Sequence, residues 1–367
     1  AGKLAAQQAP PANPAPVANI KIPDQAAIMI KAMADEMGRA KQLRLIGQDP
    51  LYYIEYALDD AVSYGVTATA RVGSPAFDNT NYLLSNAYFG VRYDPENFPL
   101  DNNYNILRQA FWLATDRAFK TAIEAIGRKR AALRNVNQSE KLPDFTAAKP
   151  ARFIGNINPV PFSEAEWKQR TVSLSGIFSS YPEIQESSIE FESVQSTAYY
   201  LNSESSLALT PDTVAYFRIR ASSQAPDGMR LRDHATIQAL NAATMPPEST
   251  LRQAVTNVAN NLKALVAAPL GDSYSGPVAF EGEAAAQLFA EMLSSALPAT
   301  RRPIAEPGRP FNWTPGIFEG RIGSRILPSS FTVVDDPTQK EIRGRNLLGH
   351  YSVDLEGVEA TPVTVIE

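Results

Sequence analysis

The chain of 367 residues is long enough to bury a large core, and its length predicts about two to three domains. A formal net charge of −5 leaves no basic excess to attract phosphates, which argues against nucleic acid as a partner. Cysteine is absent, which excludes disulfides and thiolate zinc sites within this sequence, and no apolar run approaches the roughly 18 residues of a membrane span.

Residues 1–20 are rich in alanine and proline, a composition that buries too little apolar surface to offset the entropy of ordering. We therefore expect a flexible leader. A leader of this kind often follows a cleaved secretory signal, and the sequence starts at Ala1 rather than at methionine. These features favour a periplasmic or secreted protein, while an ordinary linker in a cytoplasmic protein stays open as the alternative.

Residues 21–268 predict an α+β domain in which long helices flank an antiparallel sheet. Asp24 is expected to cap a first helix of about five turns. Residues 51–93 are rich in tyrosine, valine, threonine and isoleucine with polar residues interleaved, which favours strands. The side-chain oxygens at 101–103 can cap a helix that reaches about Leu133, because its apolar residues recur every three or four positions.

The second half of this domain also combines helices with strands. Ser163 and Glu166 form a capping-box pattern that opens a helix through Phe178. Residues 184–221 favour strands again, and near their end apolar and polar residues alternate as in a half-buried strand. Pro247 then stands where proline is favoured at the start of another linking helix.

Residues 269–367 predict the start of a β-rich C-terminal domain. A turn at Gly282 leads into an alanine-rich helix over 283–297, after which glycine and proline become frequent. Residues 331–334 and 363–366 favour strands. The predicted fold class is therefore α+β, with an N-terminal antiparallel sheet and long flanking helices, followed by the β-rich C-terminal domain.

The only two histidines, His234 and His350, have no second histidine or cysteine at metal-ligand spacing. A zinc site built from this chain alone is therefore not expected. His234 is interpreted as a solvated or capping residue at a turn into a helix. His350 is interpreted as a structural residue ahead of a strand.

Two carboxylate pairs, Asp59 with Asp60 and Asp335 with Asp336, resemble acid/base couples in sequence. Paired carboxylates become catalytic only when burial separates their pKa values, which a sequence does not show. The second pair precedes a proline and is interpreted as a turn. No nucleophile elbow, phosphate-binding loop or dinucleotide fingerprint is present in the sequence.

Three glutamates surround the turn at Gly282. Glu281 and Glu283 lie where acidic residues suit the positive end of a helix, and Glu291 follows along the same helix. The simpler interpretation is that they are ordinary helix charges. With Gly282 they are also the candidate pocket or peptide contacts of this region.

Three stretches of the chain resemble the TldD/PmbA family, whose members were once named modulators of DNA gyrase and are now associated with peptide maturation and degradation. The first combines FDNTNYLL with PLDNNYNILRQAFWLATDRAFKTAIEAIGRK, and the second is PDGMRLRDHATIQALNAATMPPESTLRQAVTNVANNLKALVAAP. The third and most specific is YSGPVAFEGEAAAQLFAEMLSSAL, followed by RNLLGHYSVDLEGVEATPVTVIE. The resemblance implies that residues 269–367 begin a peptidase-like domain that continues past Glu367 in other members, so that it is incomplete here.

In peptidase members the helix after the corresponding glycine turn carries His-Glu-x-x-x-His, in which the histidines bind zinc and the glutamate activates water. Aligned without gaps from Gly282, these positions fall on Phe289, Ala290 and Ser294. Phenylalanine supplies no lone pair and alanine no general base. The chain thus resembles the PmbA (TldE-like) branch, and the resemblance implies that it has no cofactor of its own and that zinc resides in a paralogous partner.

Two main hypotheses follow from the resemblance, and whether the chain is an enzyme stays open between them. In the first, the chain is a noncatalytic subunit that forms a homodimer, or a heterodimer with a TldD-like subunit, around an unfolded peptide held as an extended strand. In the second, it is a self-sufficient peptidase or other hydrolase whose active residues lie beyond Glu367. A secreted peptide-binding scaffold without a proteolytic partner is the third and least supported alternative.

Overall fold

The structure is a computed structural model. It describes residues 22–60, 64–83, 97–98, 102–134, 142–297, 301–305, 308, 316–318 and 320–367. The expected leader and the end of the predicted strand region, 84–93, lie outside the described residues.

One curved sheet organises the protein. Its strands follow the order β3-β2-β1-β7-β8-β6, with β5 paired to β2 and β9 paired to β8. Neighbouring strands are antiparallel except β6 and β8, which run parallel. The bounds are β1 (Leu51–Asp60), β2 (Tyr64–Ser74), β3 (Phe77–Asp78), β5 (Asn97–Phe98), β6 (Arg152–Ile154), β7 (Glu186–Asn202), β8 (Leu207–Gln224) and β9 (Arg230–Ala239). The predicted α+β class with its antiparallel sheet is confirmed.

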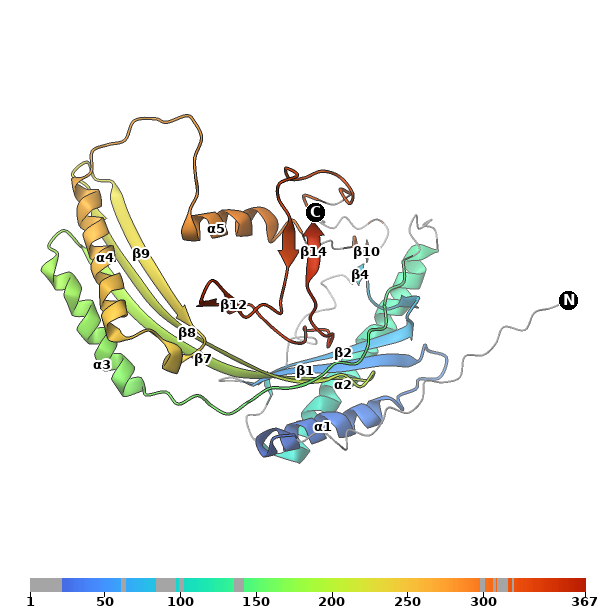
Figure 1. The fold of residues 1–367 in the computed structure, drawn as a ribbon. Coiled ribbons are helices and arrows are strands. Elements are labelled where there is room, and N and C mark those ends of the chain that lie inside the picture. The colour runs from blue at the N-terminus through green and yellow to red at the C-terminus, as the bar shows by residue number, and fades with distance from the viewer. Residues whose placement is uncertain are drawn as a thin grey trace.

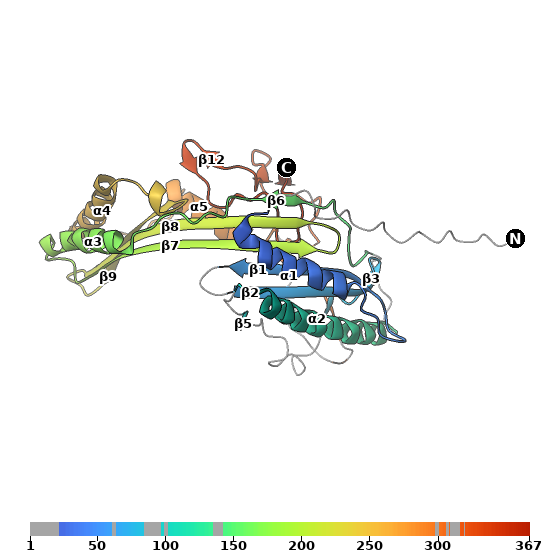
Figure 2. The same cartoon turned by 90° about the horizontal axis from the view of Figure 1, so that it is seen from below.

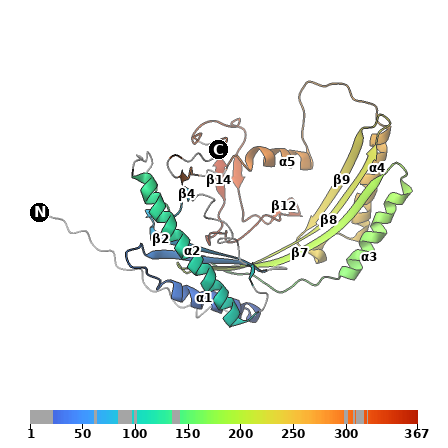
Figure 3. The same ribbon diagram turned by 180° about the vertical axis from the view of Figure 1, so that it is seen from behind.

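Helices cover the convex side of this sheet at both of its ends. Two helices, α1 (Asp24–Ala40) and α2 (Tyr104–Leu133), pack under β1 and β2 (Figures 1 and 2). At the other end, α3 (Glu164–Ser175) and α4 (Glu248–Ala267) pack on β7, β8 and β9. Short 3-10 turns, η3 (Gly176–Ser180) and η4 (Ala242–Thr244), complete this end. Figure 3 shows the same arc from behind.

Two hydrophobic cores lie between the convex side of the sheet and its helices, and both are built from alternate residues of the strands. Odd-numbered residues of β7 and β8 face the helices, as Leu209 does in one core and Phe217 and Ile219 do in the other. These residues are fully buried, which confirms the half-buried strand predicted for the end of 184–221. Even-numbered residues therefore face the concave side of the arc.

Helix caps follow the predictions in two of three places. The side chain of Asn103 accepts a hydrogen bond from the backbone N–H of Asn105 at 3.0 Å. Ser163 accepts one from the N–H of Glu166 at 3.4 Å. The prediction that Asp24 caps α1 is wrong, because Pro23 occupies the N-cap position and Asp24 is the first helical residue. In the first turn its carboxylate still suits the positive end of the helix.

The C-terminal region lies on the concave side of the sheet (Figures 1 and 3). It contains the helix α5 (Gly282–Leu293) and short strands. The strands are β10 (Ile304–Ala305), which pairs with β4 (Tyr82–Leu83), β11 (Val333–Asp335), which pairs with β14 (Val363–Ile366), and β12 (Glu341–Ile342), which pairs with β13 (Arg345–Asn346). The predicted strand at 363–366 is confirmed, and the one predicted at 331–334 begins two residues later. The turn predicted at Asp336 is also present, since its carboxylate accepts the N–H of Thr338 at 3.0 Å.

A buried polar cluster joins this region to the sheet. The hydroxyl of Tyr200 donates to the carbonyl of Glu356 at 2.9 Å and is 3.1 Å from the hydroxyl of Tyr53. The hydroxyl of Ser206 donates to the carbonyl of Gly357 at 3.0 Å. Gly357 adopts a φ of +74°, and a Cβ built there would lie 2.2 Å from the Tyr200 ring. Only glycine fits this contact.

Gly357→Ala is expected to lower the free energy of unfolding by about 1–3 kcal/mol, because alanine would be strained at this φ and would displace the Tyr200 ring. Urea denaturation measures the loss. Gly349→Ala is the matched control, since a Cβ at Gly349 meets nothing within 4 Å and its φ is not in the left-handed region. Equal midpoints for the two variants would contradict the proposed fit.

Candidate functional site

The degenerate metal-motif positions lie on α5. Gly282 begins the helix with a φ of +58°, and Phe289 and Ala290 lie in its second half, with Ser294 at its C-cap. All three are exposed, and the Phe289 ring lies 6.3 Å from that of Phe331. A phenyl ring and a methyl group have no lone pair with which to coordinate zinc, and a serine hydroxyl is not among the usual zinc ligands. The residues present here do not fit a zinc ion.

The rest of the described chain does not fit a zinc ion either. Among residues 22–367, less the gaps given above, no three His, Cys, Asp or Glu side chains gather in a way that could hold a metal ion. The imidazole Nδ1 of His350 is 2.8 Å from the carbonyl of Leu347 and so has a structural partner, although an isolated β-bridge at Val353 replaces the strand expected after it.

The candidate peptide contacts on α5 are all on the surface. Glu281 is the N-cap residue without a side-chain hydrogen bond to the helix, and Glu283 lies in the first turn. Gly282 and Glu291 are likewise exposed. None of these four residues lines the hollow described next. Their contact with a peptide stays a prediction.

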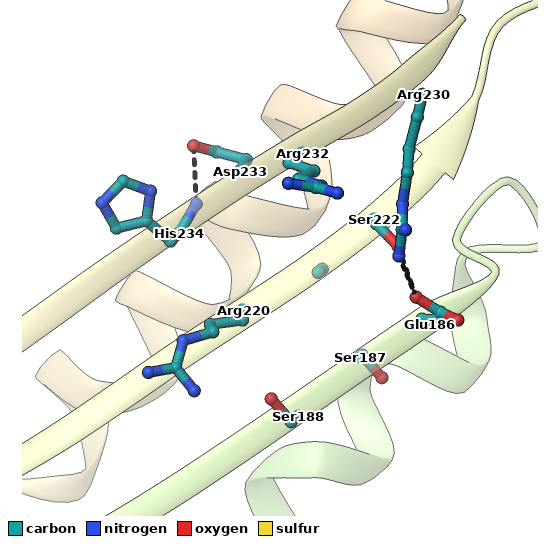
Figure 4. A pocket seen from close by; sticks show the side chains of 10 residues that line it. Glu186, Ser187, Ser188, Arg220, Ser222, Arg230, Arg232, Asp233 and His234 are labelled. Carbon is teal, nitrogen blue, oxygen red and sulfur yellow. Dashed lines mark hydrogen bonds and ion pairs between the residues drawn. The ribbon is translucent and has the colours of Figure 1, made fainter.

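A hollow of about 580 Å³ opens on the concave face, where β7, β8 and β9 lie side by side (Figure 4). No pattern in the sequence predicted this hollow. The prediction that His234 stands at a turn into a helix is wrong, because His234 lies within β9, with an exposed side chain on this face. The lining residues are Glu186, Ser187, Ser188, Arg220, Ala221, Ser222, Arg230, Arg232, Asp233 and His234.

Ion pairs link the strands across this face. Arg230 Nη2 is 2.6 Å from Glu186 Oε2, an interaction drawn in Figure 4. Arg220 Nη1 is 3.1 Å from both carboxylate oxygens of Glu190. Farther along β8, Arg218 forms a pair with Glu192 at 2.6 Å. Because the partners are largely exposed, each pair adds little to stability, and the side chains can change partners at low cost.

The tyrosine cluster beneath Gly357 is the other candidate for chemistry. Burial raises the pKa of Tyr53 and Tyr200 far above the usual 10.0, so both phenols stay protonated at neutral pH. Glu55 Oε2 also lies 2.9 Å from the Tyr200 hydroxyl and is an alternative acceptor for its single proton. Because its hydroxyls are neutral and hydrogen-bonded to protein groups, this cluster connects the C-terminal region to the sheet.

Comparison with known proteins identifies a domain in the C-terminal part of the chain. Residues 273–367 match the family described as the PmbA/TldA metallopeptidase C-terminal domain. No curated protein matches the chain. A proposed modulator of DNA gyrase from Bacteroides thetaiotaomicron superposes with a TM-score of 0.51 at 10% identity, covering 92% of this chain and 69% of that one. At that identity the likeness shows a shared fold.

Two other solved structures superpose less well. A proposed modulator of DNA gyrase from Thermotoga maritima has a TM-score of 0.48 at 12% identity, covering 86% of this chain and 63% of that one. TldE from Thermococcus kodakarensis has a TM-score of 0.28 at 11% identity, covering 57% and 42%.

The matched domain and the shared fold define a protein related to the PmbA/TldA metallopeptidases. Residues 273–367 carry the C-terminal domain of the PmbA/TldA family, so the resemblance to the TldD/PmbA family seen in the sequence is confirmed for this part of the chain. Among the helices of the described residues, none combines the length and the apolarity needed to cross a bilayer.

Proposed function

We propose that the chain is a noncatalytic subunit that pairs with a zinc-bearing paralogue and binds unfolded peptide for proteolysis or maturation. One observation carries the proposal. On α5, where the resemblance implies that peptidase members bear His-Glu-x-x-x-His, this chain has Phe289, Ala290 and Ser294. Because these side chains supply neither the nitrogen ligands that hold zinc nor a carboxylate that activates water, cleavage needs residues from elsewhere, which this proposal places on the paralogue.

The surface of α5 supports pairing. Leu288, Phe289 and Met292 expose 36%, 41% and 49% of their surface. They are neighbours on one side of the helix, since residues three or four apart share a face. An exposed apolar cluster of this kind favours burial against another protein surface. The partner is a TldD-like subunit in this proposal, with a homodimer as the alternative.

Leu288→Glu is expected to weaken pairing with the paralogue by at least about tenfold, because it places a charge inside the buried surface. Gln287→Glu is the matched control, since it adds the same charge at an exposed position one residue away. Sedimentation of the mixed proteins measures both affinities. Equal affinities for the two variants would contradict the assignment of this surface.

The free edge of the sheet supports peptide binding. Among the described strands, β9 pairs with β8 alone, so its outer edge keeps backbone donors and acceptors for an added strand. Main-chain hydrogen bonds at such an edge bind extended chains with little dependence on sequence.

The alanine- and proline-rich leader supports a periplasmic or secreted location, which fractionation of cells would test.

A cleavage assay separates this proposal from a self-sufficient hydrolase. The intact protein, its paralogue and their mixture are each incubated with an unfolded peptide, with and without a chelator. We expect no cleavage by this protein alone and chelator-sensitive cleavage by the mixture. Cleavage by this protein alone at the rate of the mixture would overturn the noncatalytic role and favour active residues beyond Glu367.

A further inference from the structure

Four arginines and a histidine gather where β8 and β9 run side by side on the concave face. We call this set the arginine face, and it consists of Arg218, Arg220, Arg230, Arg232 and His234. The register places Arg220 opposite His234 and Ser222 opposite Arg232. Arg232 is therefore diagonal to Arg220 and follows Arg230 on the same face. Like charges this close weaken a sheet unless acidic partners offset each of them.

The charge on this face is not balanced. Arg218, Arg220 and Arg230 are each paired with a glutamate of β7. Arg232 is exposed and forms no ion pair or hydrogen bond within the described part of the chain. Its neighbour Asp233 does not neutralise it. The Asp233 carboxylate accepts from Asn261 of α4 at 3.0 Å and from the N–H of His234 at 2.9 Å.

The shape of this face suits a ligand. The hollow of about 580 Å³ is within the range of small-molecule and side-chain binding sites, and it is open along the face. Figure 4 shows Arg220, Arg232 and His234 on β8 and β9 and Ser188 on β7, all of which line it. An unpaired guanidinium beside such a hollow selects planar anions, because its N–H groups match both oxygens of a carboxylate.

We propose that the arginine face binds the carboxylates of an extended acidic peptide, with Arg232 as the anchoring contact. The proposal rests on the proposed peptide-binding function and names its substrate class. A strand added beside β9 would present alternate side chains to this face, in step with Arg230, Arg232 and His234. Nucleic acid is the less suitable partner, because Glu186, Glu190 and Glu192 of β7 already pair with three of the four arginines and leave a single unpaired guanidinium, not a row of cations for a phosphate backbone.

Fluorescence anisotropy with labelled unstructured peptides tests this inference on the intact protein. One peptide carries glutamate at alternate positions and an amidated C-terminus, and the second carries glutamine at the same positions. A third is the glutamine peptide with a free C-terminal carboxylate. Arg232→Gln is the test variant. Arg252→Gln is the matched control, because Arg252 is an equally charged, exposed residue on α4 at the convex side.

We expect Arg232→Gln to weaken binding of the glutamate peptide by at least about tenfold, and Arg252→Gln to leave it unchanged. Tight, Arg232-dependent binding of the third peptide would also support the inference, with the chain terminus as the source of the carboxylate. Equal binding of all three peptides would overturn it and leave the peptide-binding function standing. Tighter binding of single-stranded DNA than of the glutamate peptide would overturn it as well. So would an equal loss of affinity for the glutamate peptide in Arg232→Gln and Arg252→Gln.

Discussion

Lys129→Ala is expected to lower the free energy of unfolding by about 3–5 kcal/mol, because it leaves a buried carboxylate without its closest cation. Lys129 lies on α2 with 1% of its side chain exposed, and its Nζ is 2.6 Å from Asp144 Oδ2. The same ammonium donates to the carbonyls of Asp78 and Thr80 at 3.0 and 2.8 Å. Arg301, at 3.3 Å from Asp144, is the only other described cation paired with it.

Lys120→Ala is the matched control on the same helix. Its ion pair with Asp116 is exposed, so we expect a loss of no more than about 0.5 kcal/mol. Guanidinium denaturation compares the two variants. If both lost the same free energy, Lys129 would not link α2 to the segments around Asp78 and Asp144.

Phe217→Ala is expected to cost about 3–5 kcal/mol, because it removes a fully buried aromatic side chain from the core between β8 and helices α3 and α4. Tyr216→Ala is the control on the preceding residue of β8, whose side chain faces the concave side and is only partly buried. Thermal unfolding of both variants measures the difference. A larger loss for Tyr216→Ala would contradict the assignment of the convex side as the packed side.

Much of the fold follows from periodicity in the sequence. The alternation of Ala215, Phe217 and Ile219 predicted a strand with one buried face, and the structure buries that face. Caps at Asn103 and Ser163 were predicted from residue type, because their side chains satisfy backbone N–H groups that no helix can satisfy internally.

The arginine face was not predicted, because the charged residues of β9 obscured the alternation of apolar and polar residues that is typical of a strand. Leu231, Ala235 and Ile237 pack against the helix side, but the intervening charged residues made the stretch look like a solvated turn. Buried Lys129 was missed for a related reason. It lies on the apolar face of α2 beside Ala125 and Ile126, but a lysine is expected at the surface unless its partner from a distant segment is known.

The metal-motif positions were predicted from the resemblance and not from physical pattern. The structure shows where they lie, on an exposed helix at the concave side of the sheet, and it shows no set of ligands around them among the described residues. The apolar neighbours on that helix were visible in the sequence, but their exposure depends on what packs against α5, which periodicity does not reveal.

Zinc content tests the noncatalytic role of this protein most directly. The intact protein is purified without chelators, dialysed against metal-free buffer and analysed for zinc by mass spectrometry, alone and in complex with its paralogue. We expect well under one zinc per chain for the isolated protein and one per paralogue in the complex, because Phe289, Ala290 and Ser294 supply no zinc ligand set. Stoichiometric zinc in the isolated protein would contradict the noncatalytic role.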